Sequence, residues 1–215
     1  MRVTILGASR NTGKALVEQA LESGRVEITV LARAPEHLPF TSEQLAKLTV
    51  VKGDATVKAD LARAVEGADM VITSLGAKMS LTGTADMGVE ETATRLLLEI
   101  IEETRADSKP RIIMVSSTGV GTSRDVPLIM RPLVSLLLRT PHRHKAVAEA
   151  AIRQSGAPFT LVRPALLTNG ALTRTYRAAP YVCGYTISRS DVAHFVLEQC
   201  ILEDRWVGEA PAIAY

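Results

Sequence analysis

The stretch Arg2-Val3-Thr4-Ile5-Leu6-Gly7-Ala8-Ser9-Arg10-Asn11-Thr12-Gly13, close to the amino terminus, decides the fold. Residues 2–6 are a short and largely apolar run, as in a strand that is buried on both faces. Gly7 interrupts the run, and apolar residues then recur at helical spacing over 12–23 until Gly24. A strand that turns at glycine into a helix leaves backbone N–H groups free to face an anion. The stretch therefore predicts a phosphate-binding turn.

The glycine pattern of this turn is incomplete. Gly7 stands where the strand must turn sharply, and Gly13 stands where the helix must pack closely on the strand. The middle glycine of a dinucleotide-binding turn is missing, because its two usual positions hold Arg10 and Asn11. Asparagine tolerates a left-handed backbone, so the turn can still form, although a turn without a ligand is the alternative. The residues expected to contact a dinucleotide here are Gly7, Ser9, Arg10, Asn11, Thr12 and Gly13.

A basic residue follows the second predicted strand, residues 27–31. Arg33 lies about twenty residues after the glycine turn, where an NAD-binding protein carries an acid for the ribose hydroxyl. Arginine presents a planar, permanently charged fork that binds a phosphate through two parallel hydrogen bonds. Arg33 and Arg10 together favour NADP(H) over NAD(H) as the cofactor. The alternative is that both are ordinary surface cations.

Strand and helix patterns alternate along the rest of the chain, without an internal repeat or a low-complexity linker. This alternation predicts an α/β fold, a Rossmann-type doubly wound parallel sheet, with ligands at the carboxyl ends of the strands. A single domain over 1–215 is expected, because a separate substrate domain would need more chain. The remaining predicted strands are 48–52, 68–75, 111–116, 159–163 and 186–188, and the remaining predicted helices are 60–66, 84–105, 142–155 and 191–202.

Composition narrows the class of protein. The apolar fraction of 47% is ordinary, and the net charge of +2 is spread along the chain, which gives no footprint for nucleic acid. Residues 126–138 are too short and too interrupted to span a bilayer, and no signal-peptide pattern is present. Cys183 and Cys200 favour a reduced pair without a metal-binding spacing. We expect a cytoplasmic monomer or weak homodimer that binds a small molecule, with no nucleic acid, membrane or metal as partner.

Further cofactor contacts are expected where the later strands end. Asp54 can accept a hydrogen bond from the adenine amino group, or it is a solvated turn residue beside Gly53. Leu75 and Gly76 let the backbone approach the cofactor closely, or they simply end the fourth strand. Pro164 follows the sixth strand, where this fold brings backbone against the nicotinamide carboxamide.

The order and spacing of these segments resemble the atypical short-chain dehydrogenases of the NmrA-like group, especially the flavin reductase (NADPH)/biliverdin reductase B type. The resemblance covers nearly the whole chain. The segments that carry it are Gly7-Ala8-Ser9, Thr12-Gly13, Val30-Leu31-Ala32-Arg33, Gly53-Asp54, Ile112-Ile113-Met114-Val115-Ser116-Ser117, His144-Lys145-Ala146-Val147, Glu149, Ser155-Gly156 and residues 187–195. It implies a Rossmann fold, NADP(H) bound across the strand ends, and hydride transfer to a small unsaturated acceptor. The Tyr-x-x-x-Lys pair of short-chain reductases is absent, since none of Tyr176, Tyr181 and Tyr185 precedes a lysine at that spacing.

The catalytic candidates are Ser117, Lys145 and His142. Ser116 and Ser117 end the central strand, and Ser117 matches the pocket serine of the family, although strand-end serines can also satisfy local backbone. Lys145 matches a lysine that NmrA-like reductases hold near the nicotinamide ribose, and the alternative is an exposed helical lysine. His142 can supply a proton near neutral pH, and its i, i+3 relation to Lys145 favours it over His144.

Two irregular segments, 119–141 and 170–185, are predicted to wall a substrate pocket. Their apolar and tyrosine side chains indicate an apolar or aromatic substrate, unless they pack in the core. The leading hypothesis is an NADPH-dependent reductase acting on a carbonyl, enone, quinone or flavin/tetrapyrrole-like acceptor. The alternatives are a non-enzymatic NADP(H) sensor, as some NmrA-like proteins are, and a redox-neutral isomerase or cyclase on the same fold.

Overall fold

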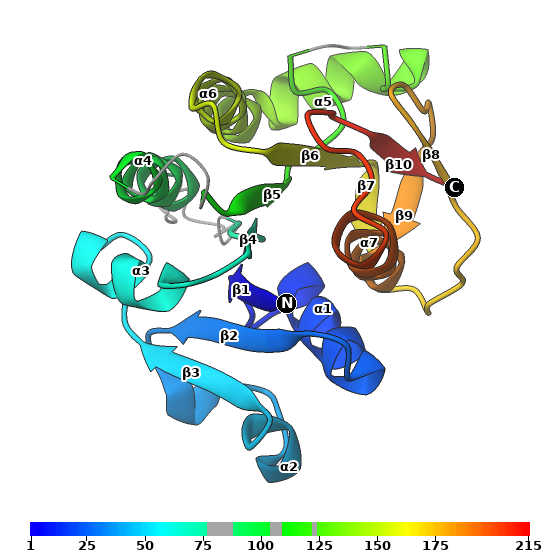
Figure 1. Ribbon diagram of the computed structural model, residues 1–215. Coiled ribbons are helices and arrows are strands. Elements are labelled where there is room, and N and C mark those ends of the chain that lie inside the picture. The colour runs from blue at the N-terminus through cyan, green and yellow to red at the C-terminus, as the bar shows by residue number, and fades with distance from the viewer. Residues whose placement is uncertain (77–87, 104–108, 122–123) are drawn as a thin grey trace.

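A computed structural model describes residues 1–76, 88–103, 109–121 and 124–215. In this part of the chain, eight strands form one sheet (Figure 1). Their order across the sheet is β3 (Leu48–Lys52), β2 (Glu27–Ala32), β1 (Arg2–Leu6), β4 (Met70–Thr73), β5 (Arg111–Val115), β6 (Phe159–Pro164), β10 (Ala212–Ala214) and β8 (Arg177–Ala179). Within the described residues the pairings are parallel from β3 through β10, and β8 is antiparallel to β10. The doubly wound α/β fold expected from the sequence is confirmed.

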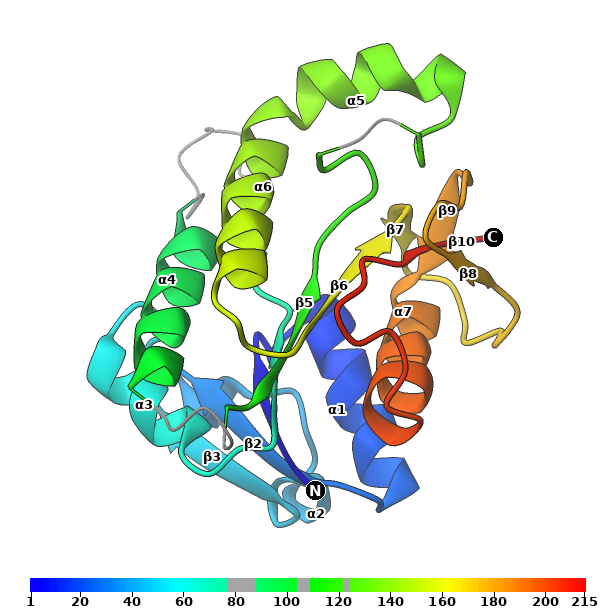
Figure 2. The same ribbon diagram turned by 45° about the horizontal axis from the view of Figure 1, so that its top comes forward.

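The helices cover both faces of the sheet (Figure 2). Their bounds are α1 (Asn11–Ser23), α3 (Lys58–Val65), α4 (Val89–Glu102), α6 (Arg139–Gln154) and α7 (Arg189–Phe195), which continues as the π-helical segment η4 (Val196–Leu202). On one face Leu16 of α1 and Val192 of α7 share an apolar cluster with Ile5. On the other face Leu97 of α4 and Ile152 of α6 pack in a second cluster around β5. Strands β4 and β5 are buried along their full lengths, which explains the apolar runs Met70–Ile72 and Ile112–Val115.

The structure differs from the sequence-based expectation mainly at element ends and in short elements. The fourth strand is shorter than 68–75, and α6 begins at Arg139 because Pro141 is tolerated in the first turn of a helix. Residues 84–87 and 104–105 of the expected helix 84–105 lie outside the described residues. The short elements that were not anticipated are α2 (Ser42–Leu45), α5 (Arg131–Leu137), β7 (Leu166–Thr168) and the 3-10 turns η1 (Pro35–His37) and η3 (Leu128–Met130), besides β8 and β10.

One of these short elements has a recognisable pattern in the sequence, and the short strands have none. Thr41 and Gln44 form a capping box at the start of α2, and that pattern is recognisable in the sequence. Strands of three residues carry too little periodicity to be recognised. The pair formed by β7 and β9 (Thr186–Ser188) depends on tertiary contacts.

In the described part of the chain no helix has the length and apolarity required to cross a bilayer.

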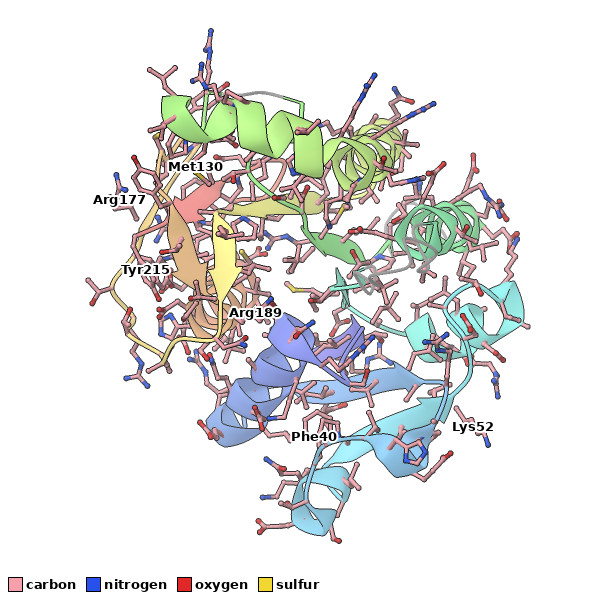
Figure 3. The ribbon with its side chains drawn as sticks, turned by 180° about the vertical axis from the view of Figure 1, so that it is seen from behind. Phe40, Lys52, Met130, Arg177, Arg189 and Tyr215 are labelled. Carbon is pink, nitrogen blue, oxygen red and sulfur yellow. The ribbon has the colours of Figure 1, made fainter. Side chains whose placement is uncertain are left out.

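One buried carboxylate, Asp191, holds the carboxyl-terminal part of the chain together. It accepts hydrogen bonds from the backbone N–H groups of Thr173 and Arg174, at 2.9 and 2.7 Å. It also accepts from the hydroxyls of Thr173, Ser188 and Tyr215, at 2.8, 3.0 and 2.5 Å. Tyr215, labelled in Figure 3, is thereby fixed beside β9. Burial acts to raise the pKa of Asp191, but these hydrogen bonds outweigh it and hold the pKa below its ordinary value.

We expect Asp191→Ala to reduce the free energy of unfolding by about 3 kcal/mol at pH 7, because several buried donors lose their acceptor. The folded-state pKa of Asp191 lies below the unfolded one, so this contribution is present above a pH of about 4 and is lost as the pH falls further. Urea denaturation at several pH values measures both effects. Asp69→Ala, at a half-exposed carboxylate, is the control and should cost about 1 kcal/mol or less. Equal losses from the two variants would contradict the assignment.

Candidate functional site

Two glycines shape the turn between β1 and α1. Gly7 has a φ of +93°, and a Cβ there would lie 2.5 Å from the carbonyl oxygen of Ser74, just after β4. A Cβ at Gly13 would lie 2.2 Å from the carbonyl oxygen of Gly7. Neither position can accept a side chain without moving backbone. Asn11 has a φ of +56°, the left-handed conformation that asparagine tolerates in place of the missing glycine.

The first turn of α1 is suited to an anion. Arg10 is the N-cap residue, and its side chain does not cap the helix. The first turn contains no acidic residue, so no carboxylate opposes an incoming negative charge. The N–H groups of Asn11, Thr12 and Gly13 precede the first intrahelical bond, which runs from Lys14 N–H to the Arg10 carbonyl at 3.2 Å. These donors and the positive end of the helix dipole form an anion-binding turn at the carboxyl edge of the sheet.

Arg33 and Asp54 meet at the ends of β2 and β3. The Nη1 atom of Arg33 lies 3.9 Å from Oδ2 of Asp54, and their side chains are 67% and 34% exposed. The other carboxylate oxygen of Asp54 accepts from the backbone N–H and the hydroxyl of Thr56, at 2.9 and 2.8 Å. An exposed ion pair of this length is weak, so the guanidinium can turn to a ligand at little cost.

The segment after β4 borders the same turn. The N–H of Ser74 donates to the Leu6 carbonyl at 2.9 Å, which continues the β1–β4 pairing by one step. Leu75 is half-buried and Gly76 is exposed, so both lie at the surface next to the glycine turn. The two residues therefore lie at the edge of the sheet where the sequence predicted a cofactor contact. Residues 77–87, which follow them, are outside the part of the chain that the structure describes.

The two serines after β5 have different surroundings. Ser116 is buried, and its hydroxyl donates to Oε1 of Glu149 on α6 at 2.5 Å. Ser117 is half-buried, and its hydroxyl makes a local bond to the Thr118 carbonyl at 3.1 Å. The hydroxyl of Ser117 can therefore turn to a ligand more readily than that of Ser116, whose contact to a cofactor would have to come from its backbone.

Lys145 on α6 points at the end of β5, and all three of its N–H donors have acceptors. Its Nζ lies 2.7 and 2.9 Å from the carboxylate oxygens of Glu90 on α4 and 3.1 Å from the Val115 carbonyl oxygen. Burial raises the pKa of Glu90, although the ammonium of Lys145 opposes the shift. The residue four positions before Lys145 is Pro141, so this helix carries no tyrosine at the reductase spacing.

The two histidines of α6 face different partners. A Cβ at Gly119 would lie 3.0 Å from Cε1 of His142, so the ring packs against the loop after β5. Its Nε2 is buried and has no hydrogen-bond partner among the described residues. Burial, followed by the charge of Lys145, lowers the pKa of His142, and Glu149 opposes this. His144 instead bonds to Glu91 on α4, with 2.6 Å between Nδ1 and Oε2.

The predicted pocket walls contact each other and carry exposed apolar groups. The guanidinium carbon of Arg124, in segment 119–141, lies 5.7 Å from the ring centre of Tyr181, in segment 170–185. Leu128 and Ile129 are also exposed. The sequence analysis assigned no role to the buried charged residues Glu90, Glu149 and Arg163. The signal for Arg163 was a charge at the end of an apolar strand, which requires a buried partner.

Comparison with known proteins identifies the family. A sequence profile described as NAD(P)H-binding matches residues 7–203, which include the glycine turn and the ends of β2, β3, β4, β5 and β6. The chain belongs to this NAD(P)H-binding family. The family assignment agrees with an anion-binding turn at the carboxyl edge, where the two phosphates of a dinucleotide bind in this fold.

Several relatives of this NAD(P)H-binding chain are named as redox enzymes. Reductase pytE of Aspergillus terreus is 29% identical over 259 residues, which cover 99% of this chain and 97% of that protein. Oxidase pynE of Aspergillus niger is 26% identical, with 96% of each chain covered. The family and these relatives support an oxidoreductase.

Solved structures share the fold at lower identity. A wide-type short-chain dehydrogenase/reductase from Veillonella parvula, in complex with NADP, has a TM-score of 0.77 at 20% identity, covering 100% of this chain and 94% of that one. ChuY, an anaerobilin reductase from Escherichia coli O157:H7, has a TM-score of 0.76 at 20% identity, covering 100% and 97%. At these identities the likeness concerns the fold alone.

Lys145→Met should destabilise the protein by about 3 kcal/mol, because it leaves the carboxylate of Glu90 buried without its cation. Adding Glu90→Gln should recover much of that loss, which a double-mutant cycle by urea denaturation measures. Lys58→Met is the matched control, since Lys58 pairs with the exposed Glu103 and should cost about 1 kcal/mol or less. A double variant no more stable than Lys145→Met would refute this account of the pair.

Proposed function

We propose that the protein is an NADPH-dependent reductase that transfers a hydride to a small apolar or aromatic acceptor. The acceptor classes are a carbonyl, an enone, a quinone and a flavin- or tetrapyrrole-like molecule. The observation that carries the proposal is the arrangement of Arg33 at the end of β2, beside the uncapped first turn of α1. A cation there favours a 2′-phosphate, where a carboxylate would favour the ribose hydroxyls of NAD.

In the adenosine half of the site, different side chains can bind the 2′-phosphate and the adenine of NADPH. The exposed guanidinium of Arg33 is proposed to bind the 2′-phosphate, with Arg10 on the other side of the turn. Once Arg33 pairs with the 2′-phosphate, the carboxylate of Asp54 loses its weak ion pair. It is then free to accept a hydrogen bond from the adenine amino group.

The nicotinamide half brings polar groups to the ends of β5 and β6. The bound cofactor supplies a hydride, and the acceptor gains negative charge that the protein must stabilise or neutralise. Ser117 is proposed to orient the acceptor oxygen through its hydroxyl. Lys145 can hold ribose hydroxyls or stabilise the negative charge if it exchanges part of its contact with Glu90. His142 is proposed as the proton donor, and Pro164 contributes backbone.

A non-enzymatic NADP(H) sensor is the second candidate, and one observation favours it. Pro141 stands four residues before Lys145, and the donors of Lys145 are satisfied by protein groups. A site with no tyrosine acid and an occupied lysine can bind the cofactor without using it. A redox-neutral isomerase or cyclase is a third class, without an observation of its own.

The test is NADPH binding by calorimetry, followed by NADPH oxidation with a panel of quinones, flavins and enones. We expect binding and turnover of at least one acceptor. Binding without turnover on every acceptor would replace the reductase by the sensor. Failure to bind either nicotinamide cofactor would reject both.

Arg33→Asp should weaken NADPH binding by about 10- to 100-fold, because a hydrogen bond between charged groups is lost and like charges meet. NADH binding should change by about threefold or less, since it has no 2′-phosphate. Dissociation constants for both cofactors give the comparison. Arg25→Asp is the control, because Arg25 is an exposed arginine just before β2, at the opposite edge of the sheet. Equal losses for NADPH and NADH would reject the role of Arg33.

If His142 donates the proton, reductase activity should fall as the pH rises through its pKa, which lies below the ordinary value of about 6.5. The sign follows because only the protonated imidazole can act as the acid. A kcat profile between about pH 5 and 8 measures it, and His142→Gln should lower kcat and flatten that limb. His144→Gln is the control and should keep the slope. A slope unchanged in His142→Gln would exclude this proton donor.

A further inference from the structure

A buried ionic network lies behind the carboxyl ends of β5 and β6. Glu149 of α6 accepts from the Ser116 hydroxyl at 2.5 Å and from Nε of Arg163 at 3.1 Å. Nη2 of Arg163 bonds to the second oxygen of Glu149, so the pair is bidentate. The side chains of Glu149 and Arg163 are only 5% and 12% exposed. One carboxylate thus joins a helix to two neighbouring strand ends.

A second carboxylate extends the network into the loop after β5. Asp125 is buried, and its Oδ1 accepts from the Gly119 N–H at 3.1 Å. Burial raises the pKa of Asp125, whereas the Gly119 N–H and the charge of Arg163 act to lower it. Arg163 is therefore bound by Glu149 of α6, and Asp125 bonds to the loop beside it.

The backbone of the two strand ends is paired at the same level. Ser116 N–H donates to the Val162 carbonyl at 2.7 Å, and Thr118 N–H donates to the Pro164 carbonyl at 2.9 Å. Ser117 lies between these two bonds. The network therefore fixes, from the helix side, the backbone that carries Ser117 and Pro164, the two positions proposed to face the nicotinamide ring.

We propose that Glu149 is a positioning residue for the nicotinamide half of the dinucleotide site. It does not touch the ligand; it holds the ends of β5 and β6 at the separation and orientation the ring requires. A misplacement of reacting groups by about 1 Å can cost 100-fold in rate, so this bracing has functional consequences. The proposal rests on the proposed function, because it assumes that a dinucleotide binds across these strand ends.

The adenosine half does not depend on Glu149. It is formed by the glycine turn, Arg33 and Asp54, which belong to β1, β2, β3 and α1. Among the described residues, the hydrogen bonds of this network join α6, β6 and the segment that follows β5. Loss of Glu149 should therefore weaken binding of the nicotinamide half and leave binding of the adenosine half unchanged, whereas general destabilisation would weaken both.

The experiment compares two ligands, NADPH and 2′,5′-ADP, which lacks the nicotinamide half. In Glu149→Gln the dissociation constant of NADPH should rise about tenfold, while that of 2′,5′-ADP should stay within about twofold. The fluorescence of NADPH at saturation, which reports on the surroundings of the ring, should shift toward that of free NADPH. Ser116→Ala removes one hydrogen bond of the network and should give a smaller change in the same direction, in a variant less prone to unfold.

The matched control lies at the other end of the same strands. Thr160 of β6 accepts from the buried Arg111 of β5 and donates to the Trp206 carbonyl at 2.8 Å. Thr160→Val should lower stability but leave the ratio of the two dissociation constants unchanged. Equal weakening of both ligands in Glu149→Gln would overturn this inference but not the proposed function. The same change in the ratio of dissociation constants in Thr160→Val would have the same consequence. A wild-type protein that binds neither ligand would overturn the proposed function, and this inference with it.

Discussion

The close approach of the first turn to the end of β4 is the constraint on which the rest of the carboxyl edge depends. A Cβ at Gly7 would lie 2.5 Å from the backbone of Ser74, and one at Gly13 would lie 2.2 Å from Gly7 itself. Because both are glycine, α1 begins directly above the sheet, with its free N–H groups at the strand ends. A bulkier turn would move α1 away from β4 and open the anion site to water. Arg10 and Asn11 are both exposed, so their side chains lie outside this packing.

A single face of α6 organises the other half of the edge. His142, Lys145 and Glu149 are spaced i, i+3 and i+7, and they contact successive parts of the exit from β5. Two of the three are ionic, and each is neutralised by a partner from another element, Glu90 on α4 and Arg163 on β6. Buried charges of this kind rarely add net stability compared with apolar residues. Their value lies in a defined geometry, which is why they are concentrated where a ligand must be oriented.

The sequence was informative where structure is local and uninformative where it is not. The glycine turn, the doubly wound parallel sheet and the position of Arg33 follow from patterns within the first 33 residues and from strand–helix alternation. The partners of Lys145 and Ser116 are separated from them by 55 and 33 residues, so no local pattern could pair them. Asp191 illustrates the same limit: it has the pattern of an ordinary acid in a first helical turn, and only its bond from Ser188 is local. Its bonds from Thr173, Arg174 and Tyr215 come from residues 17 to 24 positions away. Three-residue strands such as β7 form because tertiary contacts pair them.

The two halves of the site therefore differ in how function is built into them. At the proposed adenosine end, the guanidinium of Arg33 is exposed and weakly paired, so we expect its substitution to affect cofactor choice more than stability. At the nicotinamide end, the polar groups are buried and mutually satisfied, so a substitution changes packing, charge and orientation together. A chain with this division can change its cofactor by a surface substitution. A change in the chemistry at this end would involve the whole network, because Lys145 is bound to Glu90 and the position four residues before it holds Pro141.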